Sequence, residues 1–422
     1  MPLSDPTDNP INARRVLILA YAFLPENLVG ALRPARFAKY LREFGFSTQV
    51  VTASVQEPGA FENEVCYVRD PVRDGHGFVG KVLRLSESLL MKAYASGGGS
   101  QALAWLPSAL QESEERMPFD YIISTSPPTV THLTALGLKL RHPSLRWVAD
   151  FRDPLYGNPS RIENRTRFWD KYIERVIIRH ADCVIATTDA LADVWRERYP
   201  EQRSKVTHIW NGFDPADEIR ALPTRGCERK IIAHIGDIYA GRHPEQLINA
   251  AQHLLEAGAL SPSSLEFSFA GYIDVQYLRL FDPLIQKGVL SLSPLSKSHA
   301  EARRLMAEAD SLLLVDWTEG SGGLQVPAKL FVYIQIGRPI LAITKVDSPV
   351  DRILSRSEVP YVCLYPDDSV EQSAAKLRKF LSMPSTPTRP SEWFIREFDG
   401  RKQAEKLAGI LRSMLKNERG KS

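Results

Sequence analysis

The sequence predicts an α/β protein made of two doubly wound, Rossmann-like domains that face each other across a cleft. Short apolar runs alternate with amphipathic helical segments along most of the chain. A polar stretch with Pro and Gly, residues 222–229, interrupts this alternation near the middle. We therefore expect an N-terminal domain over residues 1–208 and a second domain over 209–390. Helices within 391–422 should cross back to the first domain, because the last one, Arg401 to Leu415, has an apolar stripe that needs a second surface.

Length and composition limit the class of protein. The 422 residues are enough for two or three domains, each with a full core. Lys and Arg number 53 against 50 acidic residues, a balance that argues against a dedicated nucleic-acid binder. The four cysteines lie far apart and lack metal-ligand spacing, so we expect reduced packing residues in a cytoplasmic protein and no metal. The N-terminus lacks a signal-peptide core, and no run reaches the ~18 apolar residues of a spanning helix.

The segment from Phe78 to Met91 leaves two interpretations open. Its apolar residues are interrupted by Lys81 and Arg84, with Lys92 just beyond, a composition typical of a helix in a membrane interface. Under that interpretation the protein would contact the inner face of the membrane peripherally. The other interpretation is a pair of helices that cover the core of the first domain, the second of them over residues 103–110.

Two loops of the first domain carry candidate functional residues. The first expected strand runs into a loop that ends at Gly30, where the missing Cβ would let a ligand approach the backbone. A later strand ends at Asp150 and opens into a charged loop with Arg152 and Asp153. Ligands of doubly wound folds lie at the carboxyl ends of the strands. We therefore expect Asp150, Arg152 and Asp153 to be catalytic or to orient a substrate. A self-contained surface ion network is the alternative.

The long helix expected after this loop carries apolar side chains at the spacing of one helical face. They are Phe168, Trp169, Tyr172, Ile173, Val176 and Ile177. We expect this face to be buried.

Two glycine-containing loops of the second domain are suited to bind phosphate. A strand over residues 231–235 exits through Gly236 and reaches Arg242, whose guanidinium can grip two oxygens. A later strand leads into small residues at 320–323 and then into a helix with Lys329. The start of a helix presents bare N–H groups and a positive dipole to an anion. Many strand–helix–strand units bind nothing, so a structural role is the alternative.

Several motifs, in their order along the chain, resemble family-4 retaining glycosyltransferases of the GT-B fold. They span Val16 to about Ile343 and read FLPENLVGALRPARFAKYLREFGF, DYIISTSPPTVTHL, WVADFRDP, IWNGFD, HIGDIYAGRHPE and VPAKLFVYIQIGRPILAI. The resemblance implies a nucleotide-diphosphate sugar bound mainly by the second domain. It implies a glycan or lipid-linked acceptor held mainly by the first domain, with transfer in the cleft between them.

The resemblance also implies roles for individual residues. Gly30 would be the first-domain loop glycine near the donor phosphates, and Arg242 and Lys329 would be the basic residues of the donor site. Backbone amides would contact the diphosphate or the sugar, and these belong to Gly322, Gly323 and Leu324.

The sequence departs from the family pattern at the donor site. The family's usual pair of glutamates falls here on Leu324 and Val332. The second glutamate ordinarily grips the ribose hydroxyls, and valine cannot accept a hydrogen bond. Loss of such a contact costs on the order of 1–3 kcal/mol. A histidine common at the first-domain strand exit corresponds to Arg152, which we expect to orient the acceptor or the transferring sugar with its acidic neighbours.

The leading hypothesis is a retaining glycosyltransferase in polysaccharide or glycoconjugate biosynthesis. The absent glutamates favour an alternative, a catalytically silent GT-B protein that serves as a partner or sugar-binding module of a glycan assembly complex. A nucleotide-sugar epimerase of similar architecture is a third possibility that the motifs support less.

Overall fold

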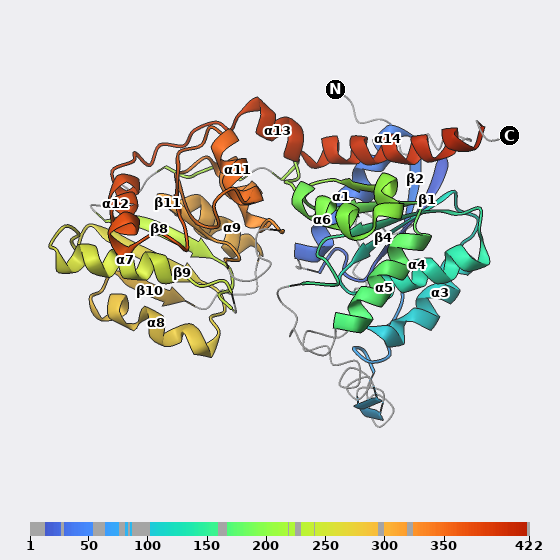
Figure 1. Ribbon diagram of the computed structural model, residues 1–422, viewed down its shortest axis with the longest axis horizontal. Helices are drawn as coiled ribbons and strands as arrows, with labels where there is room; N and C mark the ends of the chain where they lie inside the picture. Colours follow the sequence, from blue (N-terminus) through green and yellow to red (C-terminus); the bar gives the residue numbers. More distant parts are fainter. Residues whose placement is uncertain are drawn as a thin grey trace. The chain divides into compact units, whose positions relative to one another are not determined.

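The computed structural model divides into two compact units (Figure 1). Unit 1 comprises Met1–Trp210 and Gly400–Ser422, and unit 2 comprises Asn211–Asp399. The structure describes residues 13–26, 29–53, 64–75, 81–82, 85–86, 102–158, 167–217, 219–223, 229–239, 241–293, 299–318 and 324–419. Each unit is a parallel sheet with helices around it, which confirms the predicted architecture of two Rossmann-like domains.

Within the described residues, unit 1 is built on a seven-stranded parallel sheet in the order β3-β2-β1-β4-β5-β6-β7. The strands are β1 (Arg14–Ala20), β2 (Phe46–Thr52), β3 (Val65–Tyr67), β4 (Tyr121–Ser126), β5 (Arg146–Phe151), β6 (Cys183–Ala186) and β7 (Val206–His208). Successive side chains of β1 enter opposite cores, because Leu17 and Leu19 pack on one face and Val16 and Ile18 on the other. The part of this central strand that is buried on both faces, residues 16–20, is therefore apolar throughout.

Helices cover both faces of this sheet. They are α1 (Val29–Leu41), α3 (Leu106–Glu115), α4 (Val130–Arg141), α5 (Arg167–His180), α6 (Asp189–Arg198) and α14 (Gly400–Arg419). The predicted return of the last helix to the first domain is confirmed, because α14 buries Leu407 and Leu411 in the same core as α1 (Figure 1). Tyr121 Oη donates to the carbonyl of Leu411 at 2.9 Å and ties α14 to β4.

Unit 2 contains a six-stranded parallel sheet among its described residues, in the order β10-β9-β8-β11-β12-β13. Its strands are β8 (Lys230–Ile235), β9 (Leu265–Ala270), β10 (Leu290–Ser293), β11 (Ser311–Val315), β12 (Ile340–Ile343) and β13 (Tyr361–Leu364). Its helices are α7 (Glu245–Glu256), α8 (Val275–Gln286), α9 (His299–Glu308), α10 (Lys329–Ile336), α11 (Pro349–Arg356), α12 (Val370–Leu381) and α13 (Glu392–Phe398).

The helix α13 belongs to unit 2, although the expected boundary at residue 390 would place it with the first domain. Phe394 stacks on Phe213 with ring centroids 5.7 Å apart, and Phe398 lies 5.0 Å from Phe331 of α10. These rings anchor the start and the end of the unit 2 chain to each other. The transition to unit 1 comes after Asp399.

The expected buried face of α5 is confirmed only in part, because Ile177 is buried and Ile173 packs against the core, whereas the three aromatic side chains are exposed. Phe168, Trp169 and Tyr172 are 71%, 47% and 54% exposed, while Asp170 and Glu174 are buried. The physical reason is that both carboxylate oxygens of Glu174 accept hydrogen bonds from other parts of the protein. Its carboxylate accepts from the backbone N–H groups of Leu155 and Tyr156 at 3.1 and 2.9 Å, and also from the side chains of Arg198 and Tyr199. The four donors offset part of the cost of removing this carboxylate from water, so the side of α5 that carries Glu174 faces the protein and the aromatic side chains face outward.

The segment from Phe78 to Met91 lies largely outside the described residues. Of its described members, Val82 and Leu85 are 47% and 62% exposed. The helix α3, which follows, does cover the core, because Trp105 and Ala109 are buried there at its start and middle. In the part of the chain that the structure describes, no helix combines the length and apolar character needed to cross a bilayer.

Candidate functional site

The strand order of unit 2 places its candidate site at the carboxyl ends of β8 and β11. The chain progresses outward from β8 to one edge of the sheet and outward from β11 to the other, so the exit loops of these two strands diverge. In open α/β sheets ligands bind at such a switch point. Here the loop after β8 begins at Gly236, and the residues after β11 lead to α10, which begins at Lys329.

Lys329 and Gly236 are in close contact. Gly236 has a φ of +137°, and a Cβ on it would lie 2.3 Å from Nζ of Lys329. A side chain cannot occupy that space without moving the ammonium group, so the glycine is required by both its backbone conformation and its neighbour. The N-cap of α10, Ala328, makes no side-chain hydrogen bond to the helix start. Lys329 is the first residue of α10, and helical side chains lean toward the N-terminus, so its ammonium lies near the positive end of the helix.

A buried histidine faces this lysine. His234 Nδ1 donates to the carbonyl of Leu313 at 3.0 Å, and its Nε2 lies 3.4 Å from Nζ of Lys329. Burial lowers the pKa of His234 well below its usual value, so the neutral imidazole offers an Nε2 lone pair to the lysine. Burial also lowers the pKa of Lys329 to about 7, with further lowering by Arg242 and an opposing effect of Asp237.

Arg242 is the second cation of the unit 2 site. Its Nη1 donates to the hydroxyl of Tyr239 at 3.0 Å, and its guanidinium lies over the rings of Tyr239 and Trp317, 5.4 and 5.6 Å from their centroids. Its Nε is buried and has no hydrogen-bond partner among the residues that the structure describes. A buried guanidinium N–H without an acceptor is costly, and an anion bound there would satisfy it.

A buried carboxylate follows β11. Asp316 is 1% exposed, and its Oδ2 accepts from the hydroxyl of Thr344 at 2.8 Å. Burial raises its pKa to about 6, while Thr344 and Arg242 act in the opposite direction. Its Oδ1 has no hydrogen-bond partner in the described parts of the chain. The unit 2 site thus combines two cations with one buried acid whose pKa burial raises to about 6.

The charged loop of unit 1 contains a buried ion pair that the sequence analysis did not foresee. Asp150 is fully buried and accepts from Nε and Nη2 of Arg33 at 3.0 and 2.8 Å, and from Thr125 Oγ1 at 2.9 Å. Arg33 also donates to the carbonyls of Trp210 and Ile209 at 2.7 and 2.9 Å. Both oxygens of Asp150 are therefore engaged inside the protein, an arrangement that holds α1 against β5 and the end of β7.

Arg152 is the residue of this loop that reaches the start of α1. Its Nε donates to the carbonyl of Ser126 at 3.0 Å, and its Nη2 donates to that of Pro127. A Cβ on Gly30 would lie 2.1 Å from Arg152 Nη1, so the guanidinium lies directly against the backbone of Gly30. The structure thus brings together Gly30 and Arg152, both half-buried. Asp153, also half-buried, is the next residue of the same loop.

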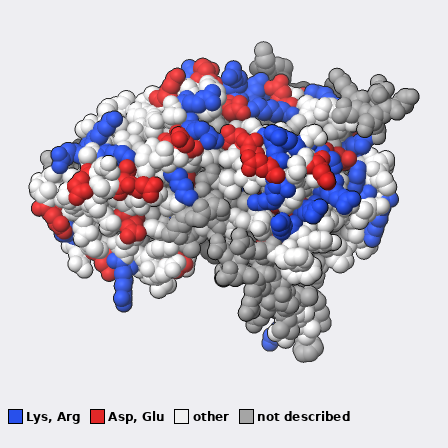
Figure 2. All heavy atoms as spheres, in the orientation of Figure 1, with Lys and Arg blue, Asp and Glu red and all other residues white. Residues whose placement is uncertain are grey.

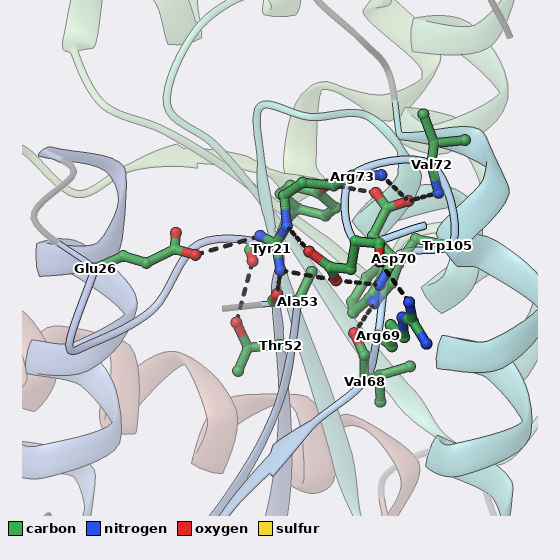
Figure 3. A network of polar contacts seen from close by, with 11 residues as sticks. Tyr21, Glu26, Thr52, Ala53, Val68, Arg69, Asp70, Val72, Arg73 and Trp105 are labelled. Atoms are coloured by element: carbon green, nitrogen blue, oxygen red, sulfur yellow. Dashed lines mark hydrogen bonds and ion pairs between the residues drawn. The ribbon is translucent and has the colours of Figure 1, made fainter. Parts of the chain in front are cut away.

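A polar network that includes Arg73 and Asp70 contacts the loop between β1 and α1 (Figure 3). Arg73 bridges Glu26, with Nη1 and Oε1 3.2 Å apart, and Asp74, and it also donates to the carbonyl of Ala53. Asp70 accepts from Tyr21 Oη and from the backbone N–H of Val72. The loop that ends at Gly30 is therefore anchored on the exits of β2 and β3.

The remaining predicted site residues are placed as follows. Leu324 and Val332 are half-buried, and Val332 lies in the first turn of α10, three residues after Lys329. Gly322 and Gly323 lie outside the described residues. The site residues that sequence reasoning missed are Arg33, His234 and Asp316. Two of them lie inside quoted motifs, but the residue types alone do not reveal that one binds Asp150 and another faces Lys329.

Comparison with known proteins gives one family match. Residues 34–217, mainly in unit 1, match the model described as Glycosyltransferase Family 4. No curated protein sequence matches the chain.

Solved structures resemble the whole fold at low sequence identity. The N-terminal domain of Candida albicans trehalose-6-phosphate phosphatase aligns with a TM-score of 0.63 at 10% identity, over 96% of this chain and 97% of that one. Anabaena HepE in complex with UDP-glucose aligns with a TM-score of 0.56 at 14% identity, over 94% and 99%. WaaG, a glycosyltransferase involved in lipopolysaccharide biosynthesis, aligns with a TM-score of 0.57 at 16% identity, over 94% and 99%. At these identities the likeness establishes the fold.

Proposed function

We propose a sugar-transfer function for this chain from two premises, the match of residues 34–217 to the Glycosyltransferase Family 4 model and the GT-B fold. The donor is a nucleotide-diphosphate sugar bound by unit 2, and the acceptor is a hydroxyl of a glycan or of a lipid-linked glycan. The anomeric configuration is retained, as the resemblance to the retaining family implies. The observation that carries the proposal is the pair of cations at the unit 2 switch point, one of them with a buried N–H that has no acceptor among the described residues.

The two cations suit the chemistry of the departing group. As the bond between the sugar and the diphosphate breaks, negative charge grows on the leaving oxygen. Lys329 at the start of α10 and Arg242 over Trp317 are positioned before the reaction, so they stabilise this charge without reorganising. Gly236, which has no side chain, leaves room for the Lys329 ammonium beside the backbone that the phosphates would approach. No metal is required for this charge neutralisation, and we expect the transfer to proceed without one.

In unit 1, Arg152 is the side chain of the charged loop that we assign to substrate contact. Its guanidinium lies against Gly30 at the start of α1, where it can bind an anionic or hydroxyl-rich group. We assign Asp150 a positioning role, because both of its oxygens are held by Arg33 and Thr125. Asp153 completes the acidic neighbourhood of Arg152.

The second candidate function is a catalytically silent sugar-binding or partner protein. The specific observation in its favour is the apolar pair Leu324 and Val332 at the positions of the family's glutamates. Neither side chain can accept a hydrogen bond from a ribose hydroxyl, which would weaken donor binding by about 1–3 kcal/mol. This candidate shares the cation pair but would release no nucleotide.

The test is nucleotide binding and turnover by the Arg242→Ala variant. We expect calorimetry with UDP-glucose and a panel of other nucleotide sugars to find one donor that binds the wild type and releases nucleotide on incubation. Loss of charged hydrogen bonds to phosphate, about 1.5–3 kcal/mol, should weaken that donor about 10- to 100-fold in Arg242→Ala. The matched control is Arg279→Ala, an exposed arginine on α8, which should bind as the wild type does.

Wild-type donor affinity in Arg242→Ala would remove the phosphate assignment. Binding without nucleotide release across the panel would favour the catalytically silent protein. Absence of any nucleotide affinity would contradict the proposal that unit 2 binds a nucleotide-sugar donor.

A further inference from the structure

One exposed surface of unit 1 combines large aromatic side chains with cations. It is the outer face of α5 and consists of Phe168, Trp169, Lys171, Tyr172 and Arg175, which we call the α5 face. The three aromatic residues are about half exposed or more, and their rings contact each other, Phe168 to Trp169 at 5.5 Å and Trp169 to Tyr172 at 6.4 Å between centroids. Exposed aromatic residues gathered in one place mark an interaction site rather than ordinary surface.

The charge on this face has one sign. Both acidic residues of α5, Asp170 and Glu174, lie on its buried side. Lys171 and Arg175 are exposed, and no ion pair joins either of them to an acidic side chain within the described residues. The helix continues with exposed Arg179. Figure 2 shows Lys and Arg side chains over the helices of unit 1, with Asp and Glu side chains among them. The α5 face is thus complementary to a negatively charged, partly apolar surface.

Aromatic residues with cations are the composition of a membrane-interface helix. Trp and Tyr favour the headgroup region, where one part of the ring is apolar and the other part is wet. Each Lys or Arg near an anionic leaflet adds to the electrostatic attraction. A glycan stacked on the rings would explain the aromatic residues but not the excess of cations. A protein partner would need an acidic patch, and nothing in the chain points to one.

The α5 face is fixed to the charged loop of the candidate site. Leu155 and Tyr156, which follow Arg152 and Asp153 in that loop, donate their backbone N–H groups to the buried carboxylate of Glu174 on α5. The aromatic residues occupy the first turns of α5, and a helix that follows a parallel strand begins at the strand's carboxyl edge. Phe168, Trp169 and Tyr172 therefore lie at the same edge of the unit 1 sheet as Arg152.

We propose that the α5 face docks unit 1 on an anionic lipid surface, beside the loop that holds Arg152. The docking itself is independent of the sugar-transfer proposal. The docking implies that the acceptor is lipid-linked and reaches the loop from the bilayer surface. This implication rests on the proposed sugar-transfer function. The docked helix lies in the plane of the headgroups and does not cross the bilayer.

The experiment is flotation of the full chain with two kinds of vesicle, phosphatidylcholine alone and phosphatidylcholine with about one third phosphatidylglycerol. We expect the wild type to float only with the anionic vesicles at about 0.1 M salt and to be released at about 1 M, where charges are screened. The triple variant Phe168→Ser, Trp169→Ser, Tyr172→Ser should bind at least about tenfold more weakly, because it loses the apolar contact. The double variant Lys171→Glu, Arg175→Glu should lose the salt-sensitive part of binding.

The matched control changes three exposed apolar residues of α8, Val275→Ser, Leu278→Ser and Ile285→Ser, and should float as the wild type does. Proper folding of each variant is checked by its thermal transition. A wild type that stays in solution with both vesicles, or a triple variant that floats normally, overturns the proposal. So does a wild-type dimer in sedimentation that the triple variant dissociates without any vesicle binding. Calorimetry with the nucleotide sugar is run on the same samples, so that a failed donor proposal and a failed docking proposal give different results.

Discussion

At the scale of single residues, the unit 2 site is governed by the charge on Lys329. Its ammonium is confined between the backbone of Gly236 and the imidazole of His234, and Arg242 repels it from the same site. In the free protein these surroundings bring its pKa to about 7. A bound diphosphate would add two negative charges and favour the protonated form again. Binding of the donor and protonation of Lys329 are then linked.

This linkage predicts that donor affinity falls as the pH rises through about 7. The free lysine loses its proton above that pH, so binding a UDP-sugar at pH about 8 must take up a proton from the buffer. The sugar ester has no phosphate that titrates near neutrality, so the proton enters the protein. Calorimetry in two buffers of different ionisation enthalpy measures the uptake. In Lys329→Met the uptake should disappear along with most of the affinity, and an undiminished uptake in that variant would assign it to another group.

The glycine in contact with Lys329 gives a second prediction. In Gly236→Ala the new Cβ would meet Nζ at 2.3 Å in a backbone conformation with φ of +137°, so the ammonium must leave its place. We expect donor affinity to fall at least about tenfold, because a charged contact to phosphate is lost. Gly258→Ala is the control, since its φ is +66° and no atom lies within 4 Å of the added Cβ. If calorimetry shows equal losses in both variants, backbone strain and not the lysine contact is responsible.

At the scale of elements, the orientation of each helix is determined by the side chains whose exposure or burial changes its free energy most. In α5 the Glu174 carboxylate, with four donors, determines the buried face, and the pKa of this group is raised by its burial. In α14 the apolar stripe alone determines the face, because Ala404, Leu407 and Leu411 enter the core beside α1. The two helices show why the same apolar spacing predicts the buried face of α14 but fails for the aromatic residues of α5.

The solvent-facing side of α14 offers a stabilising substitution. Gly409 lies in the middle of the helix, is exposed and has no atom within 4 Å of an added Cβ. Gly409→Ala should raise the free energy of unfolding of unit 1 by about 0.5–1 kcal/mol, because alanine loses less backbone entropy in a helix. Leu407→Ala, on the buried side, should lower it by about 2–5 kcal/mol. Urea denaturation followed by circular dichroism measures both. A destabilising Gly409→Ala would mean that this turn of α14 contacts another surface.

At the scale of the whole molecule, each unit has its own sheet and cores, and each carries a candidate site at the carboxyl edge of its sheet. Unit 1 presents Gly30 and Arg152, whereas unit 2 presents the two cations and Asp316. The matched family domain lies mainly in unit 1, while the residues that we assign to the donor lie in unit 2. The assignment of donor binding to unit 2 can therefore be tested directly.

We predict that a nucleotide-diphosphate sugar slows amide hydrogen exchange chiefly in the loop 236–242 and in α10. The phosphates would contact the backbone at these places and stabilise the bound form by about 2.7 kcal/mol at a hundredfold excess over the dissociation constant. Exchange in the edge strand β13, far along the sheet from β8, serves as the internal reference. Protection confined to unit 1 would place the donor there and contradict the assignment.

The sequence by itself determined the fold class, the two repeating α/β halves and the loops where chemistry would lie. The periodicity of apolar residues in strands and helices, like the position of a glycine, is a local property of the sequence. It can be recognised without knowing how the elements pack together. The partners of charged side chains are not local. Only the tertiary structure showed that Asp150 is held by Arg33, which is 117 positions away, and that Lys329 faces His234, 95 positions away. It also turned the aromatic side of α5 outward, because the free energy of a buried carboxylate depends on donors that come from other elements of the fold.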